Sequence, residues 1–89
     1  MIEARVEIIN RLGLHARAAA KLVDCAGRFS SRIKIGKAGQ LVDAKSIMSV
    51  MMLAAGKGSV LDIVVEGKDE QQAFDALTQL IADRFGEPD

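Results

Sequence analysis

The chain has 89 residues, of which 49% are hydrophobic and 27% charged, and its 12 basic and 12 acidic residues cancel to a formal net charge of zero. This size and composition predict one soluble globular domain over residues 1–89, with a small core. A chain without a basic excess is not expected to bind nucleic acid or membranes through charge, and three phenylalanines without Tyr or Trp do not supply the aromatic platform of an RNA-binding sheet.

The first predicted strand covers residues 2–9, where apolar and charged side chains alternate. A period of two is typical of a strand with one buried and one solvated face. Residues 10–14 then form a loop, in which Gly13 allows a backbone turn that other residues disfavour.

The first predicted helix covers about residues 16–26 and ends at Gly27. Its apolar side chains recur at the spacing of one helix face, and glycine is common just after a helix. The positions expected to face the core are Ala19, Leu22, Val23 and Ala26. Cys25 lies in the same apolar run, which predicts a buried or half-buried thiol without particular reactivity.

A β-hairpin is predicted next, with strands over residues 31–35 and 40–43 and a turn at residues 36–39. Apolar and charged residues alternate in the first of these strands. The glycines beside Lys37 could also indicate a phosphate site, but a hairpin tip is the favoured interpretation.

Residues 46–53 form a short predicted helix that is apolar nearly all round. We expect Val50 and Leu53 to face the sheet. Other apolar side chains are then left partly exposed: Ile47, Met48 and Met51. An exposed apolar patch rich in methionine indicates a surface that accepts several partners. The alternative is a core segment that is covered on every side.

The last strand is predicted over residues 60–66, and the last helix follows it. Asp69 is expected to cap this helix, with Gln72 at the capping-box position. The predicted core stripe is Ala73, Leu77, Leu80 and Ile81, flanked by Phe74 and Phe85, and Gly86 and Pro88 close the helix.

The element order is therefore β-α-β-β-α-β-α, which indicates the α+β class. One antiparallel sheet with helices on one face is the natural packing for this order, and the charged alternate positions agree with a second face in solvent. Element order alone leaves the ferredoxin-like arrangement open beside others with the same order.

The candidate site is the run His15-Ala16-Arg17, at the junction of the first loop and the first helix. A helix N-terminus presents free N–H groups and the positive end of the helix dipole, which suits an anion such as phosphate. The backbone N–H groups of Ala16 and Arg17, with the Arg17 guanidinium, could hold phosphoryl oxygens while the imidazole acts as nucleophile. The alternative is that His15 serves only as a polar cap.

No metal site and no cofactor is expected, because one His and one Cys do not supply an ordinary zinc set. The single Cys25 cannot form an intrachain disulfide. The sequence shows no signal peptide and no apolar run long enough to span a bilayer, which predicts a cytoplasmic protein without membrane insertion.

The runs GLHARAAAKLV from residue 13 and KSIMSVMML from residue 45 resemble the active-site and second-helix motifs of the HPr family. These are the histidine-containing phosphocarriers of the bacterial phosphoenolpyruvate-dependent phosphotransferase system. The resemblance covers nearly the whole chain in length, motif order and spacing. It implies an open-faced β-sandwich, in which a four-stranded antiparallel sheet is covered on one face by three helices.

The resemblance also implies a function and its partners. His15 would accept a phosphoryl group on Nδ1 from phosphorylated enzyme I and pass it to EIIA-type proteins of the sugar phosphotransferase system. The chain would then be a carrier that partner enzymes turn over, not an enzyme. The partner surface would comprise Ile47, Met48, Met51 and Ala20. A monomer is the simplest expectation.

Ser46 is a second candidate site. Serine is a good helix N-cap, and this is the structural interpretation of the residue. In part of the HPr family the matching serine is phosphorylated by a dedicated kinase, HPr kinase/phosphorylase, which implies regulation at Ser46. A phosphate at a helix N-terminus leaves the fold intact but adds negative charge beside the apolar patch.

Two positions depart from the family pattern. Many members have proline where Ala18 stands, and many have Asn or Ser where Leu12 stands. Leu12 removes a polar side chain that could touch the phosphoryl group, which leaves room for the nitrogen-related, regulatory branch of the family. A different class, a non-catalytic partner-binding module, also stays open, and replacing His15 distinguishes it from a carrier.

Overall fold

The elements follow the predicted order in the computed structural model, which describes residues 1–89. Their bounds are β1 (Ile2–Glu7), α1 (Ala16–Gly27), β2 (Arg32–Lys37), β3 (Gln40–Asp43), α2 (Ile47–Met52), β4 (Val60–Glu66) and α3 (Glu70–Ala82), followed by a short 3₁₀ helix, η1 (Arg84–Gly86). None of the helices has the length and apolar character needed to cross a membrane.

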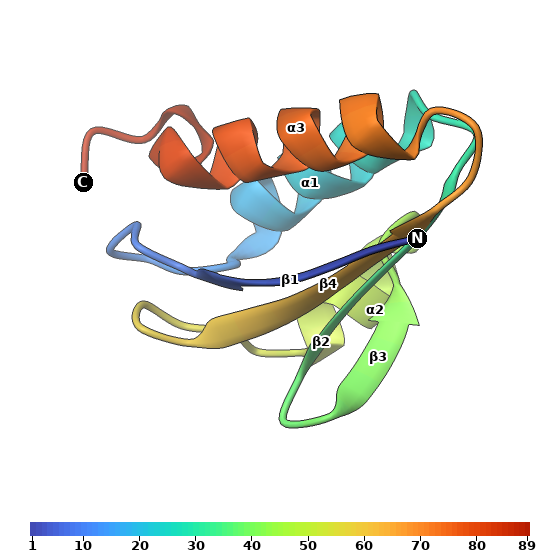
Figure 1. Cartoon of the computed structure of the whole chain (residues 1–89). Helices are drawn as coiled ribbons and strands as arrows, with labels where there is room; N and C mark the ends of the chain where they lie inside the picture. Colours follow the sequence, from blue (N-terminus) through green and yellow to red (C-terminus); the bar gives the residue numbers. More distant parts are fainter.

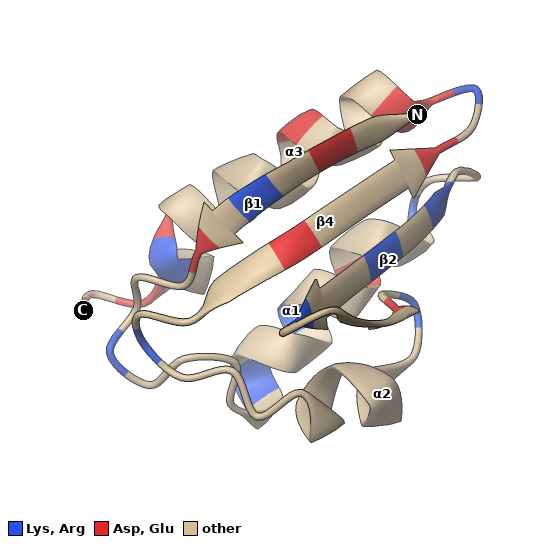
Figure 2. Cartoon of the chain, turned by 60° about the horizontal axis from the view of Figure 1, so that its bottom comes forward, with Lys and Arg blue, Asp and Glu red and all other residues tan.

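The four strands form one sheet in the order β1-β4-β2-β3, and all neighbouring pairs are antiparallel. Figure 1 shows α1 and α3 together on one side of this sheet, with α2 near β2 and β3. Figure 2 turns the opposite face forward, where no helix covers the charged residues of the strands. Across β1 and β4, Arg5 Nε donates to Asp62 Oδ1 at 3.1 Å. The predicted open-faced sandwich is confirmed.

The core lies between the sheet and the helices. The inward positions of β2 and β4 are almost fully buried: Ile33, Ile35, Leu61, Ile63 and Val65. α3 buries Ala73, Leu77 and Ile81, as its spacing predicts, whereas Leu80 is half-buried at the edge of the stripe. Helix and strand periodicity therefore predicts most of the core.

The buried face of α1 is slightly rotated from the prediction. It comprises Ala18, Ala19, Leu22, Cys25 and Ala26. Val23 is only half-buried, because a stripe that includes Ala18 and Cys25 leaves position 23 at its margin. The predicted buried thiol is confirmed, since Cys25 is 5% exposed and burial raises the pKa of its thiol.

Strand bounds differ from the prediction at the end of β1 and at both ends of β2, which begins at Arg32. β1 ends at Glu7, although Ile8 N–H still donates to Ser59 O at 2.8 Å. β2 extends to Lys37, so the hairpin turn consists of Ala38 and Gly39, with φ of 55° and 83°. Two central residues with positive φ are the requirement of the tight two-residue hairpin turn, which is shorter than the four-residue turn predicted.

The predicted cap of α3 is wrong in its chemistry. Asp69 is the N-cap residue, but its side chain makes no capping hydrogen bond. Its carboxylate accepts the backbone N–H groups of Ser30 and Ser31, both at 2.9 Å, and the Ser31 hydroxyl. Gln72 is exposed, and Glu70 Oε1 instead accepts Gly67 N–H at 3.1 Å. A loop that is distant in sequence offers Asp69 more donors than its own helix does.

Candidate functional site

His15 lies at the N-terminus of α1, as predicted. It is the N-cap residue, with φ −70° and ψ 177°, and its side chain makes no capping hydrogen bond. The first hydrogen bond of the helix joins Ala19 N–H to His15 O at 2.8 Å. The N–H groups of Ala16 and Arg17 therefore precede the bonding of the helix and point from its positive end. The imidazole therefore does not cap the helix and is available for other contacts.

The loop before His15 is held by the segment that follows α2. Leu14 is buried, and its N–H donates to Ala55 O at 2.8 Å. Gly13 has φ 65°, and a Cβ atom there would lie 2.6 Å from Ala55 O and from Gly56 Cα. Only glycine fits both this backbone conformation and this close approach. The segment after α2 thus fixes the position of His15.

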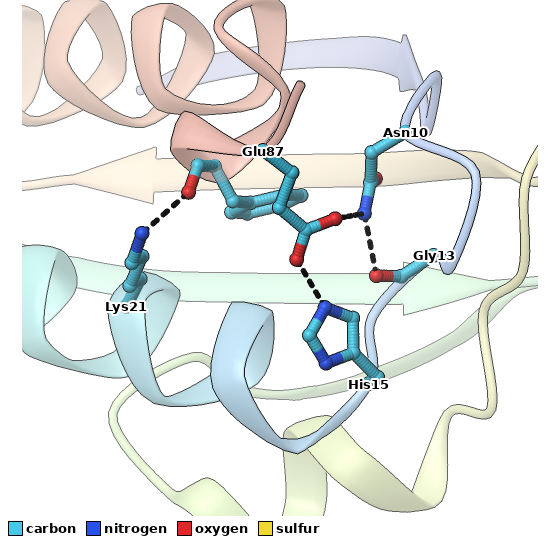
Figure 3. A network of polar contacts seen from close by, with 6 residues as sticks. Asn10, Gly13, His15, Lys21 and Glu87 are labelled. Carbon is cyan, nitrogen blue, oxygen red and sulfur yellow. Dashed lines mark hydrogen bonds and ion pairs between the residues drawn. The ribbon is translucent and has the colours of Figure 1, made fainter. Parts of the chain in front are cut away.

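The imidazole of His15 pairs with a carboxylate from the tail that follows η1. His15 Nε2 and Glu87 Oε2 form a hydrogen bond, and these side chains are 29% and 13% exposed. Figure 3 shows the Glu87 carboxylate between His15 and Asn10. Nδ1 makes no hydrogen bond. The ring therefore presents one occupied and one free nitrogen.

Asn10 fixes the second oxygen of the same carboxylate. Its Nδ2 donates to Glu87 Oε1 at 2.9 Å and to Gly13 O at 2.8 Å, and the residue is fully buried. The hydrogen bonds from Asn10 and then from His15 lower the pKa of Glu87 below its ordinary value. Glu87 is therefore a carboxylate at neutral pH.

Sequence reasoning missed Asn10 and Glu87 as site residues. Glu87 is separated from His15 by 72 positions and from Asn10 by 77. The sequence carries one faint indication: an acidic residue directly follows the glycine that closes the last helix.

Arg17 is exposed and makes no ion pair or side-chain hydrogen bond, so its guanidinium is available to an anion. It borders an open cavity of about 560 Å³ together with His15 and the tail. The lining residues are Arg11, Leu12, His15, Ala16, Arg17, Glu87, Pro88 and Asp89. The structure thus brings His15 and Arg17 to one solvent-accessible cavity, which the sequence did not predict.

Ser46 is the N-cap residue of α2, as predicted. Its Oγ accepts Ser49 N–H at 3.3 Å. The helix itself is six residues long, too short to form without such a cap and tertiary packing. The side chain is half-buried at the end of the element.

The apolar patch on α2 is exposed as predicted. Val50 and Leu53 are buried, at 0% and 9% exposure. The outward side chains are Ile47, Met48 and Met51, at 38%, 68% and 42% exposure. Met52, which the prediction omits, is the most exposed, at 80%. Ala20 on α1 is also exposed, and α2 packs against α1.

The structure contains no group of three or more His, Cys, Asp or Glu side chains placed to hold a metal ion. The ionisable contacts at the site are pairs instead. Besides His15 with Glu87, Arg11 Nε lies 3.6 Å from Asp89 Oδ2.

Comparison with known proteins gives consistent matches over the whole chain. Residues 2–83 match the family described as "PTS HPr component phosphorylation site". The chain is 59% identical over 87 residues to a phosphocarrier protein HPr of Cupriavidus necator, covering 98% of each. It is 54% identical over 83 residues to a phosphocarrier protein HPr of Pseudomonas aeruginosa, covering 92% of each. Among solved structures, HPr from Thermoanaerobacter tengcongensis superposes with a TM-score of 0.94 at 47% identity, covering 98% of each chain.

Proposed function

This chain belongs to the PTS HPr family, and from that membership we propose that it carries a phosphoryl group on His15. The observation that supports this most strongly is the position of the imidazole. It stands at the N-terminus of α1, partly exposed, beside an unpaired Arg17. That position combines a nucleophile with an anion site.

Phosphoryl uptake transfers the group from a phosphohistidine of enzyme I. The lone pair of His15 Nδ1 forms a bond to phosphorus, while the P–N bond of the donor breaks and its electron pair returns to the donor nitrogen. Catalysis of such a transfer is mainly positioning and charge stabilisation. The N–H groups of Ala16 and Arg17 and the Arg17 guanidinium receive the phosphoryl oxygens.

Phosphoryl release repeats the same exchange with an EIIA-type protein as acceptor. The chain is then a covalent relay in the cytoplasm and not an independent enzyme. The apolar patch of Ile47, Met48 and Met51, with Ala20, serves as the docking surface for successive partners. Leu12 stands where many family members have Asn or Ser, and it is exposed in the cavity beside His15. The second candidate function is therefore a carrier of the nitrogen-related, regulatory branch.

Phosphorylation at Ser46 by an HPr kinase/phosphorylase would regulate docking. The hydroxyl caps α2, whose next residues carry the apolar patch. A phosphoryl group there adds roughly two negative charges at that helix end, which opposes the burial of Ile47 and Met48 in an interface. Phosphopeptide mass spectrometry of cells across growth conditions tests this regulation, and a consistently unmodified Ser46 peptide would refute it.

The carrier function is tested with phosphoenolpyruvate and a bacterial enzyme I. We expect the intact mass to increase by one phosphoryl group, and brief acid treatment to remove it. Because His15 is the only histidine, the variant His15→Ala should acquire no acid-labile group while keeping its fold. Absence of label with enzyme I of both the sugar and the nitrogen-related branch would instead favour a non-catalytic binding module.

A further inference from the structure

We infer that Glu87, braced by Asn10, is a positioning residue that holds the Nε2–H of His15 and thereby leaves Nδ1 as the nucleophile. This inference rests on the proposed carrier function and adds to it the group that selects the reacting nitrogen. A carboxylate can only accept hydrogen bonds, so the nitrogen that meets it must carry the proton. In the neutral imidazole, the other ring nitrogen then has its lone pair free.

Both oxygens of the Glu87 carboxylate are engaged by different groups. Oε2 meets His15 Nε2, and Oε1 accepts Asn10 Nδ2 at 2.9 Å. Figure 3 shows these contacts converging on Glu87 from two directions. Asn10 is itself held by Gly13 O at 2.8 Å, within the loop that carries His15. The carboxylate therefore has one orientation with respect to the ring, which is what a positioning residue requires.

The turn that precedes Glu87 is anchored to the rest of the fold. Arg84 and Phe85 have φ of 57° and 56°, a left-handed conformation that is unfavourable for residues other than glycine. Such strain persists where the surroundings over-determine the backbone. Here the Phe85 side chain is 1% exposed, and Lys21 Nζ donates to Phe85 O at 2.6 Å. This strained, anchored turn sends the chain back from α3 toward His15.

The tail is also fixed beyond Glu87. Arg11 N–H donates to Asp89 O at 2.8 Å, and Arg84 donates to Pro88 O at 3.0 Å. Anchors on both sides make the Glu87 contact part of the fold and not a chance encounter of two exposed side chains.

The proton and charge balance of the transfer explains the use of a carboxylate. When Nδ1 bonds to phosphorus, Nε2 keeps its proton, and the ring becomes an imidazolium. No proton has to leave the site, and the Glu87 carboxylate faces the new positive charge across the same hydrogen bond. On release, Nδ1 recovers its electron pair while Glu87 still accepts the Nε2–H hydrogen bond.

The tautomer is tested in the unphosphorylated protein by ¹⁵N NMR of the His15 ring at pH 8.5. We expect Nε2 to be protonated and Nδ1 unprotonated in the wild type, and a mixture of both forms in Glu87→Ala. Glu87→Gln retains an acceptor without the charge and should show an intermediate population. The matched control is Asp83→Asn, which removes the same charge from an exposed tail residue without a side-chain hydrogen bond. Protonated Nδ1 in the wild type, or an unchanged ring in Glu87→Ala, overturns the inference.

The kinetic test is the rate of phosphoryl uptake from phosphorylated enzyme I. Loss of one charge-assisted hydrogen bond predicts a roughly tenfold slower uptake in Glu87→Ala, a smaller decrease in Glu87→Gln and no change in Asp83→Asn. Equal rates for the wild type and a folded Glu87→Ala contradict the inference but leave the carrier function in place. No uptake by the wild type contradicts the carrier function itself, while the NMR result still decides whether Glu87 sets the tautomer.

Discussion

At the scale of single residues, Gly13 shows how one backbone conformation positions a reactive group. It combines a φ of 65° with an approach to the 55–56 backbone that leaves no room for a Cβ atom. The hydrogen bond from Leu14 N–H to Ala55 O depends on this approach. Displacing it would move His15 with respect to Glu87 and Arg17.

Gly13→Ala is therefore expected to lower the free energy of unfolding by about 2–4 kcal/mol, since strain and a backbone clash add. Urea titration measures this. Gly27→Ala is the control, because no atom lies within 4 Å of a Cβ there and alanine favours a helix, so its stability should be equal or higher. Equal losses in both variants would contradict the role assigned to position 13.

Asp69 illustrates a carboxylate whose ionisation supports the fold. The hydrogen bond from the Ser31 hydroxyl, followed by that from Ser30 N–H, lowers the pKa of Asp69 from 3.8 to about 2. The folded state therefore binds fewer protons than the unfolded state between these two values. The stabilisation is complete above about pH 4 and is lost as the pH falls toward the folded-state pKa.

The expected result is a urea midpoint of the wild type that decreases between pH 4 and pH 2. Asp69→Asn should be less stable at pH 7 and should show a shallower decrease over that interval, because the group that titrates is gone. Asp83→Asn changes an exposed acid whose side chain makes no hydrogen bond, so this variant should keep the slope of the wild type. A variant of Asp69 with an unchanged slope would show that another carboxylate is responsible.

At the scale of elements, the turn between β2 and β3 requires a positive φ at a residue that is not glycine. Gly39 suits its φ of 83°, but Ala38 adopts a φ of 55° at some cost. The antiparallel pairing on either side, from Lys37 with Gln40 to Lys34 with Asp43, holds the turn in place.

Ala38→Gly should raise the free energy of unfolding by about 0.5–1 kcal/mol, because glycine accepts positive φ without strain. Thermal unfolding followed by circular dichroism measures the change. The same substitution at Ala20, an exposed position inside α1, should lower stability by about 1 kcal/mol. A stability gain at position 38 together with a loss at position 20 would show that the gain comes from relief of backbone strain and not from a general effect of glycine.

The exposed and buried sides of α2 agree with the prediction because the helix is so short. In a helix of six residues, only one face can reach the core, so Val50 is buried while Met48 and Met52 point outward. Ser46 begins the helix through its bond to Ser49 N–H. Local capping and a single buried position suffice to define the element, and its remaining apolar surface is exposed.

At the scale of the whole molecule, the exposed apolar side chains of α2 and the open face of the sheet are two different surfaces. The patch of Ile47, Met48 and Met51 belongs to an element packed against α1, whose N-cap residue is His15. Leu41 is similarly exposed, at 44%, but it lies with Glu3, Arg5 and Asp62 on the open face.

Met48→Asp is expected to slow phosphoryl uptake from enzyme I about tenfold at limiting protein concentration, because a charge in an apolar interface opposes docking. Its unfolding free energy should not change, since Met48 is 68% exposed. Leu41→Asp is the matched control and should leave uptake unaffected. The measurements are uptake kinetics over a range of protein concentrations and urea titrations of the same variants. Together they show whether the slower uptake comes from weaker docking or from lower stability.

Local sequence patterns predict the order of elements, most of the core and the place of His15 and Arg17 at the start of α1. These features depend on periods of two and 3.6 and on residues that favour helix ends, which are properties of neighbouring positions. The cap at Ser46 and the exposure of Met48 follow from the same local rules.

The side chains that contact these groups depend on the tertiary fold. Glu87 reaches His15 over 72 positions, and Asp69 reaches Ser31 over 38. Asn10 braces Glu87 over 77. Such contacts leave no period in the sequence, because they depend on how the tail turns at Phe85 and how helices pack on the sheet. In the proposed function, the start of α1 supplies the phosphoryl site, and the inferred role of the folded tail is to select the imidazole nitrogen that reacts.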